Sequence, residues 1–469
     1  MSLVAPTALA LARALLIAGL AVAVAMWLSG WLAAQRGRTQ TIAWTLLLAP
    51  FFTPPLLISY AFAKFALALV AAPLGHEALY LGVLTLKLAP VAVIVRLLGP
   101  PPLSAEAWHG YRTIMTTGGQ RFVAAPTQAA TKRCPPSRSL TAFWQVVWFR
   151  VRGEGRSLWL AAGLVFLLAF ADFELASLWS LKTWTVAIFD AQIGGLALTE
   201  TLRLAATPLF VQIALLAFLA RAARGSRGQP GTPFARPSSA RRGPWIYLAS
   251  AAALLSALPL AIISAQAVTG FRMLAENFVL GPEIGASVLF ALAAALGASA
   301  LARLGRGRNA ALLLGAPGLL GALVVSLLLL ALFQMPLLRA AYDTPLPLTL
   351  ALTVLLLPLA LLLGALATPP TPARHLARQV GSRRLLWELE TRPRALALGL
   401  LFCWAYFDFT ASSILAPVGF TPVFVRLHNL AHYGQTAVLS AMMLAAFTVP
   451  VLTVLLAGVA GRWCTVRRG

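Results

Sequence analysis

Acidic side chains follow two long apolar segments of this sequence. Asp172 and Glu174 lie in "FADFELASLWSLKTW" (170–184), and Asp408 lies in "YFDFTASSILAPVGF" (406–420). An ionisable side chain in a membrane span costs at least about 2.5 kcal/mol at mid-depth, and it normally faces protein or water. These three carboxyl groups are therefore the first candidates for a functional site.

The depth of the two aspartates follows from their distance to the nearest arginine. Asp172 stands sixteen residues after Arg156, and Asp408 stands sixteen residues after Arg392. That spacing is roughly 24 Å of helix, so we expect both carboxyl groups near the outer end of a span. Two compatible interpretations are open. The pair lines the outer mouth of a cation pathway, or each aspartate caps the turn that follows its helix.

The elements that position these residues must be membrane helices. The 469 residues are 60% hydrophobic and 11% charged, and their mean hydropathy is +0.83. Apolar stretches of about 20 residues recur along the chain, and this length crosses a bilayer as a helix. The net charge of +24 comes from arginines clustered between these stretches, which argues against a nucleic-acid surface.

The apolar pattern predicts eleven spans. Segment 42–72 is too long for one straight crossing, and its "APFFTPPLL" stretch predicts a kink. The predicted spans are 8–34, 42–72, 79–100, 157–180, 203–221, 245–268, 284–303, 309–334, 346–367, 394–416 and 436–460.

A stretch rich in Gly, Pro, Ser and Arg, 222–244, indicates a cytoplasmic linker. It separates a first half, 1–221, with about five spans from a second half, 245–469, with about six. The arginine-rich connections all fall on one side when the spans are counted alternately. The positive-inside bias then places the N-terminus outside and the C-terminus in the cytoplasm.

The two halves contain a repeat. Residues 156–177 match 392–413 at 10 of 22 positions, and the alignment pairs Asp172 with Asp408 and Glu174 with Thr410. The matched helices are spans 4 and 10, so an even number of crossings separates them and both run the same way. We therefore predict a parallel repeat with its axis along the membrane normal. A second similarity, between "LLLAP" (46–50) and "LLLGAP" (312–317), places a proline inside a matching helix of each half.

On these residues the chain resembles a fused ABC-importer permease, closest to ferric-iron permeases, with thiamine permeases nearby. The stretches that carry the likeness are 172–190, 312–345 and 407–435. The resemblance implies an all-α polytopic membrane fold, with about eleven transmembrane helices in two parallel-repeat halves, as in type I importers. It implies the inner membrane of a bacterium, two copies of an ABC ATPase subunit, a periplasmic solute-binding protein, and ferric iron as solute. Thiamine, a polyamine or a phosphonate-like solute stays open.

Permeases of this family dock a short cytoplasmic helix into a groove of the ATPase. The stretch "HLARQVGS" (375–382) occupies the corresponding place, and the candidate coupling residues are Ala377, Arg378, Gly381 and Ser382. The corresponding stretch of the first half, 104–139, matches the motif poorly, which puts docking on that side in doubt.

The chain has no G-x-x-x-x-G-K-[ST] phosphate loop, so ATP must bind to a separate subunit. Its lysines are Lys64, Lys87, Lys132 and Lys182. We expect no intrinsic cofactor. No Ser/His/Asp or paired-carboxylate arrangement indicates catalysis, so we do not expect an enzyme.

His428 and His432 share a helix face in "RLHNLAHYGQ" (426–435). A metal site would need a third ligand that the sequence does not identify, so none is assigned. Together with Asn429 and Tyr433, these histidines predict a short outer helix that contacts the solute-binding protein. The tryptophans at 144, 148, 159, 179, 184, 245 and 404 mostly fall near span ends, as in an interfacial belt, and we assign none of them, Trp404 included, a ligand role.

Two other function classes compete with an importer. A secondary transporter driven by an ion gradient would place carboxylates at mid-depth and use discontinuous helices with inverted symmetry. A membrane-embedded scaffold or enzyme subunit would need no coupling loop. An ATPase that co-purifies with the chain would favour the importer over both.

Overall fold

The computed structural model describes residues 3–69, 71–98, 155–224, 242–277, 280–305, 308–367, 379–380, 385, 387–432 and 436–466. All regular structure in these ranges is helical. The helices of the first half are α1 (Val4–Ala34), α2 (Gly37–Phe52), α3 (Pro55–Leu69), α4 (Pro73–Leu98), α7 (Gly155–Phe170), α8 (Glu174–Leu178), α9 (Trp184–Ile193) and α10 (Leu198–Arg224).

The second half begins with a leading helix, α11 (Arg242–Ala252), that continues through a π-helical turn, η1 (Ala253–Ala257), into α12 (Leu258–Asn277). The other elements are α13 (Gly281–Leu304), α14 (Arg308–Gly315), η2 (Pro317–Leu320), α15 (Ala322–Phe333), η3 (Arg339–Ala341), α16 (Leu346–Leu366), η4 (Trp387–Thr391), α19 (Arg392–Tyr406), α20 (Thr410–Leu415), α21 (Val423–His432) and α22 (Thr436–Val466).

The helices have the length and apolar character of a multi-pass membrane protein. In the described ranges, seven are long and apolar enough to cross a bilayer, and two bent pairs bring the number to nine. These nine coincide with nine of the eleven predicted spans. Predicted span 394–416 is broken after Tyr406, and the apolar part of α22, Ala437–Thr453, is short. The count of eleven therefore stays a prediction.

Two spans are broken in their middle. The kink predicted in segment 42–72 is confirmed, because α2 and α3 meet at an angle of 77°. Pro54 and Pro55 cause it, since neither supplies the N–H that would continue the helix. The second break was not expected, because we read 309–334 as one span. There α14 and η2 meet α15 at 104°, and Gly321 turns the chain with a φ of +90° that other residues rarely adopt.

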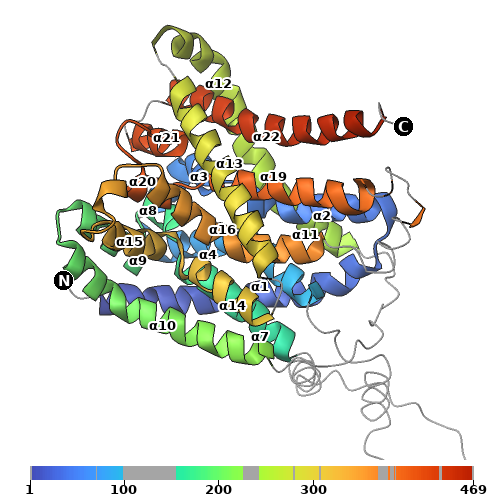
Figure 1. Ribbon diagram of the computed structural model, residues 1–469, viewed down its shortest axis with the longest axis horizontal. Helices are drawn as coiled ribbons and strands as arrows, with labels where there is room; N and C mark the ends of the chain where they lie inside the picture. The colour runs from blue at the N-terminus through green and yellow to red at the C-terminus, as the bar shows by residue number, and fades with distance from the viewer. Residues whose placement is uncertain are drawn as a thin grey trace, which may run out of the picture.

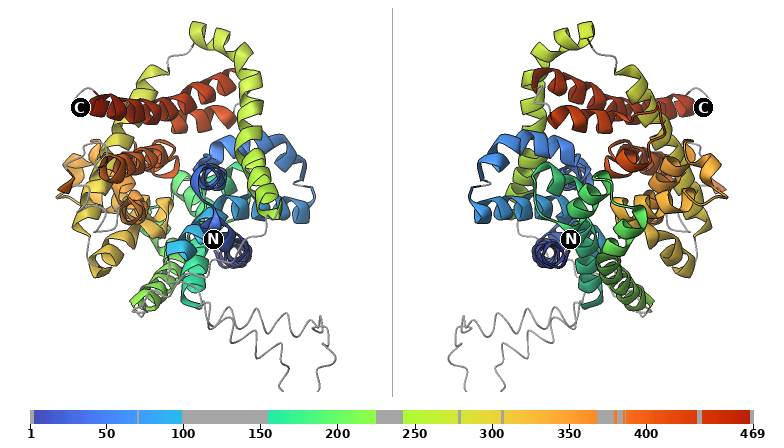
Figure 2. Two further views of the ribbon diagram at one scale, coloured as in Figure 1. Left: turned by 90° about the vertical axis from the view of Figure 1, so that its right-hand side faces the viewer. Right: turned by 90° about the vertical axis from the view of Figure 1, so that its left-hand side faces the viewer.

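The same order of packed helices occurs in both halves (Figure 1). In the first half α1 and α4 pack on α7, and in the second α13 and α16 pack on α19. Likewise α3 packs on α8, as α15 packs on α20, and the final helices α10 and α22 pack on α7 and α19. The leading helix crosses between halves, since α11 contacts α2 and α12 contacts α3 (Figure 2).

The two termini lie at opposite ends of the long axis (Figure 1). The ends of α1 and α10 and the beginnings of α7, α11 and α19 lie toward the end that holds the C-terminus. The breaks that precede α8 and α20 lie toward the N-terminal end. The helix ends that adjoin the arginine-rich connections thus gather at one end of the molecule, and the acidic segments gather at the other.

The contact between α12 and α22 gives a test of this packing. A Cβ atom at Gly270 would lie 1.9 Å from the backbone oxygen of Ala437, so Gly270→Ala forces the two helices apart. We expect it to lower the free energy of unfolding by about 1–3 kcal/mol, as measured by chemical denaturation in detergent. The control Gly285→Ala meets open space in α13 and should be neutral or slightly stabilising. Equal effects of both changes would contradict the packing.

Candidate functional site

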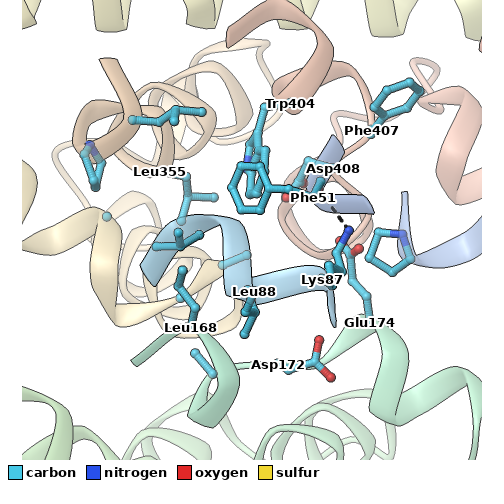
Figure 3. A pocket seen from close by; sticks show the side chains of 18 of the residues that line it. Phe51, Lys87, Leu88, Leu168, Asp172, Glu174, Leu355, Trp404, Phe407 and Asp408 are labelled. Atoms are coloured by element: carbon cyan, nitrogen blue, oxygen red, sulfur yellow. Dashed lines mark hydrogen bonds between the residues drawn. The ribbon is translucent and has the colours of Figure 1, made fainter. Parts of the chain in front are cut away.

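A cavity of about 290 Å³ lies between the two halves. Its wall comes from three pairs of elements: the two mid-span breaks at 51–55 and 318–322, helices α4 and α16, and the segments where α7 and α19 end. Each half therefore supplies the same kinds of element to the wall, and Figure 3 shows their side chains converging on the cavity.

Helices α4 and α16 line the cavity with equivalent residues. When the helices are aligned at Pro90 and Pro358, every α4 residue that lines the cavity has a lining counterpart on α16. The pairs are Leu84 with Leu352, Lys87 with Leu355, Leu88 with Leu356, Val91 with Leu359, and Ile94 with Leu362. Four of the five pairs are aliphatic on both sides, and Lys87 is the exception.

Lys87 caps the C-terminal end of helix α2. Its Nζ donates to the backbone oxygens of Phe51, at 3.1 Å, and Thr53. Pro55 stands four residues after Phe51 and has no N–H, so the helix itself cannot satisfy that carbonyl. The ammonium also meets the negative end of the helix dipole. This lysine is 9% exposed, and the buried charge is retained because the break needs a donor.

The second break uses a different donor. Gln212 of α10, which is fully buried, donates Nε2 to the backbone oxygen of Leu320 at 3.1 Å. Leu320 is the counterpart of Thr53 when Pro50 and Pro317 are aligned. The corresponding carbonyls of the two breaks are thus satisfied by an ammonium in one half and by an amide in the other.

Asp172 and Asp408 cap the short helices that follow them. The Oδ2 atom of Asp172 accepts from the backbone N–H of Ala176 at 3.2 Å, and that of Asp408 accepts from Ser412 at 3.1 Å. These bonds stand at equivalent positions of the repeat. The capping interpretation is therefore confirmed. Both aspartates also line the cavity, while their role in a pathway stays a prediction.

Asp172 has further support from helix α4. The hydroxyl of Tyr80 donates to its Oδ2 at 3.0 Å, and the Tyr80 ring lies 5.9 Å from the guanidinium of Arg13. Arg13 is an ion-pair partner of Glu77 and donates to the backbone oxygen of Lys182 at 2.9 Å. We did not anticipate this network, because its members are far apart in the sequence.

Glu174 joins the two halves. Its Oε1 accepts from the backbone N–H of Phe409 at 3.2 Å and from the hydroxyl of Thr410 at 3.3 Å. Glu174 and Thr410 are counterparts in the repeat, and so are Phe173 and Phe409, whose rings stack with centroids 6.1 Å apart. In both contacts, a residue of one half meets its own counterpart of the other half.

A row of four rings runs through this contact between the halves. Phe189 packs on Phe173 at 4.5 Å, Phe173 stacks on Phe409, and Phe409 stacks on His428 at 4.0 Å. Phe189 and His428 are each the sixth residue of their helix, α9 and α21 respectively. We call these four residues the ring row.

Two of the four predicted docking residues have described side chains, and their docking role stays a prediction. His428 is half-buried in the ring row and does not stand free on an outer surface, because Phe409 of the neighbouring segment covers it. Asn429 is exposed. The side chain of His432 and all of Tyr433 lie outside the described residues, as do the candidate coupling residues Ala377, Arg378, Gly381 and Ser382.

Aromatic side chains form a part of the cavity wall that we missed. Trp404 lines the cavity with Phe51, Phe52 and Phe407, and its ring lies 4.6 Å from that of Phe51 and 6.2 Å from that of Phe52. Our reading of Trp404 as an interfacial anchor therefore needs correction. The available signal was its position four residues before Asp408, which itself lies beyond the end of α19.

The charged groups of the wall come mainly from the first half. Lys87 lies within electrostatic range of Glu174 and Asp172, and Figure 3 shows its amine beside the Glu174 carboxyl group. Among the described residues, no group of three or more His, Cys, Asp or Glu side chains is arranged to hold a metal ion. No protein-family model, no curated protein and no solved structure matches the chain.

Replacing Lys87 tests its role at the break. Lys87→Met leaves the Phe51 and Thr53 carbonyls without their donor, and an unsatisfied buried group costs about 1–3 kcal/mol. We expect that loss in the free energy of unfolding, measured by denaturation in detergent. Leu355→Met, at the counterpart position, should cost less than about 1.5 kcal/mol. An unchanged stability of Lys87→Met would contradict the role.

Proposed function

We propose that this chain is the membrane subunit of an ATP-driven ABC importer, with both halves in one polypeptide. The observation that carries the proposal is the cavity between two halves that supply equivalent residues to its wall. A path between two such halves opens to one side and then to the other when the halves rock against each other, which is a common basis of alternating access. The host membrane would be the inner membrane of a bacterium, with the N-terminus outside.

The ring row supports a closed outer end in this proposal. The rings of Phe173 and Phe409 stack just before α8 and α20, and Glu174 ties the same segments together. Helices α8 and α20 lie toward the N-terminal end of the long axis (Figure 1). A solute brought by a periplasmic binding protein would enter when these contacts part. The energy would come from two copies of an ATPase that dock at the other end, with Ala377, Arg378, Gly381 and Ser382 as coupling residues.

Ferric iron is the solute that the family resemblance implies, and it stays a prediction. Asp172, Glu174 and Asp408 are the carboxyl groups that would meet a cation in the path, because all three line the cavity.

The broken helices favour a second candidate, a transporter driven by an ion gradient. Such carriers place discontinuous helices around their binding site, and here two mid-span breaks border the cavity. The two candidates differ in what drives transport, so the partner of the chain separates them.

The test is co-purification of an ATPase from native membranes. We expect the full chain to retain an ABC ATPase, and we expect deletion of 374–392 to remove it, because this stretch contains the candidate coupling loop. Uptake of solute into proteoliposomes should then require ATP and should persist when ionophores collapse the ion gradients.

Deletion of 226–240 from the linker is the matched control and should leave the ATPase bound. Uptake that continues without an ATPase and stops with ionophores would contradict the importer and favour the second candidate.

A further inference from the structure

The two sides of the cavity differ in chemistry. One side carries the carboxyl groups of Asp172, Glu174 and Asp408 together with the Lys87 ammonium. Another part of the wall is aromatic, with Phe51, Phe52, Trp404 and Phe407, and the remaining lining residues are almost all aliphatic. A solute that satisfies this wall must therefore carry both a polar group and a sizeable apolar body.

The polar group of the solute should be positive. Hydrogen bonds from the protein reach Oδ2 of Asp172, Oε1 of Glu174 and Oδ2 of Asp408. The lining residues thus bring three carboxyl groups to the wall and, in Lys87, one ammonium. The single ammonium of the wall, that of Lys87, is instead directed to the backbone oxygens of Phe51 and Thr53, so it offers little to an anion.

Trp404 and Asp408 both line the cavity. Trp404 lies in α19, Asp408 lies two residues beyond the end of that helix, and the ring of Phe51 packs against the Trp404 ring. Its counterpart in the first half is Leu168, which has the same spacing to Asp172. A ring face and a carboxylate together favour an organic cation, because the ring attracts a cation through its quadrupole.

We infer that the cavity binds an organic cation with an apolar or aromatic body, and that Glu174 and Trp404 determine this specificity. The inference rests on the proposed function as a solute transporter and assigns it a substrate class different from the ferric iron that the resemblance implies. A bare metal ion fits the wall less well, because metal sites need several converging ligands and the described residues hold no such group.

The experiment measures binding to the full chain, purified in lipid nanodiscs without an ATPase. The probe is radiolabelled benzyltrimethylammonium, and the competitors are the neutral isostere neopentylbenzene, the anion benzoate and ferric citrate. We expect saturable binding that the neutral isostere, benzoate and ferric citrate do not displace.

Two variants test the named residues. Glu174→Gln keeps the oxygen that accepts from Phe409 and Thr410 but removes the charge, and it should weaken binding at least about tenfold. Trp404→Leu reproduces the residue of the other half and should weaken binding by roughly tenfold. The matched controls are Glu200→Gln and Trp159→Leu, whose side chains are exposed on α10 and α7, and they should bind as the native chain does.

A third variant adds charge without touching the carboxyl groups. Leu355→Lys places a second ammonium at the counterpart of Lys87 and should abolish binding. If Glu174→Gln or Trp404→Leu no longer elutes as a single species, the binding measured for Leu355→Lys decides the test in its place. Displacement by neopentylbenzene, tight binding of ferric citrate alone, binding of no probe, or equal binding by Glu174→Gln and Glu200→Gln would each overturn the inference.

The outcome is separable from the test of the proposed function. If the chain binds the organic cation but retains no ATPase, this inference is supported and the importer is contradicted. If the chain retains an ATPase but does not bind the organic cation, the importer is supported and this inference is contradicted.

Discussion

The structure depends on how two related but unequal segments of the repeat meet. Residues at this contact face their own counterparts, so two glutamates there would repel and two apolar groups would leave backbone N–H groups unsatisfied. The chain resolves this with Glu174 in one half and Thr410 in the other, an acceptor facing a donor. The same carboxyl group also satisfies the Phe409 N–H, and the stacked rings of Phe173 and Phe409 complete the contact.

The cavity exists because a span is broken in each half. A break inside a bilayer exposes carbonyl groups that water cannot reach, and each must find a donor from the protein. Lys87 supplies it at the first break and Gln212 at the second. The polar character of the cavity therefore has a structural origin: the ammonium is bound to backbone, while the carboxyl groups cap helices and line the free space.

Much of the fold followed from the sequence, because long apolar stretches in a bilayer can only be helices. The repeat predicted that Asp172 and Asp408 stand alike, and the "TPP" stretch predicted the first kink. Periodicity could not show that Gly321 breaks another span, since an isolated glycine is tolerated in many helices. Nor could it show that Lys87, Trp404 and His428 face the interior. Their partners, Phe51 and Phe409, come from segments more than eighteen residues away, so only tertiary packing reveals them.

The central claim of the proposed function is that the halves part during transport at the contact between Phe173 and Phe409. Ser177 and Ser413 are counterparts in α8 and α20, both half-buried, and they can carry nitroxide labels as cysteines after the three native cysteines are replaced. Pulsed electron–electron double resonance would then measure the distance between the two labels in nanodiscs with the co-purified ATPase. The account predicts a short, narrow distance at rest and a second, longer distance when ATP is added. A single distribution that ATP does not change would contradict it.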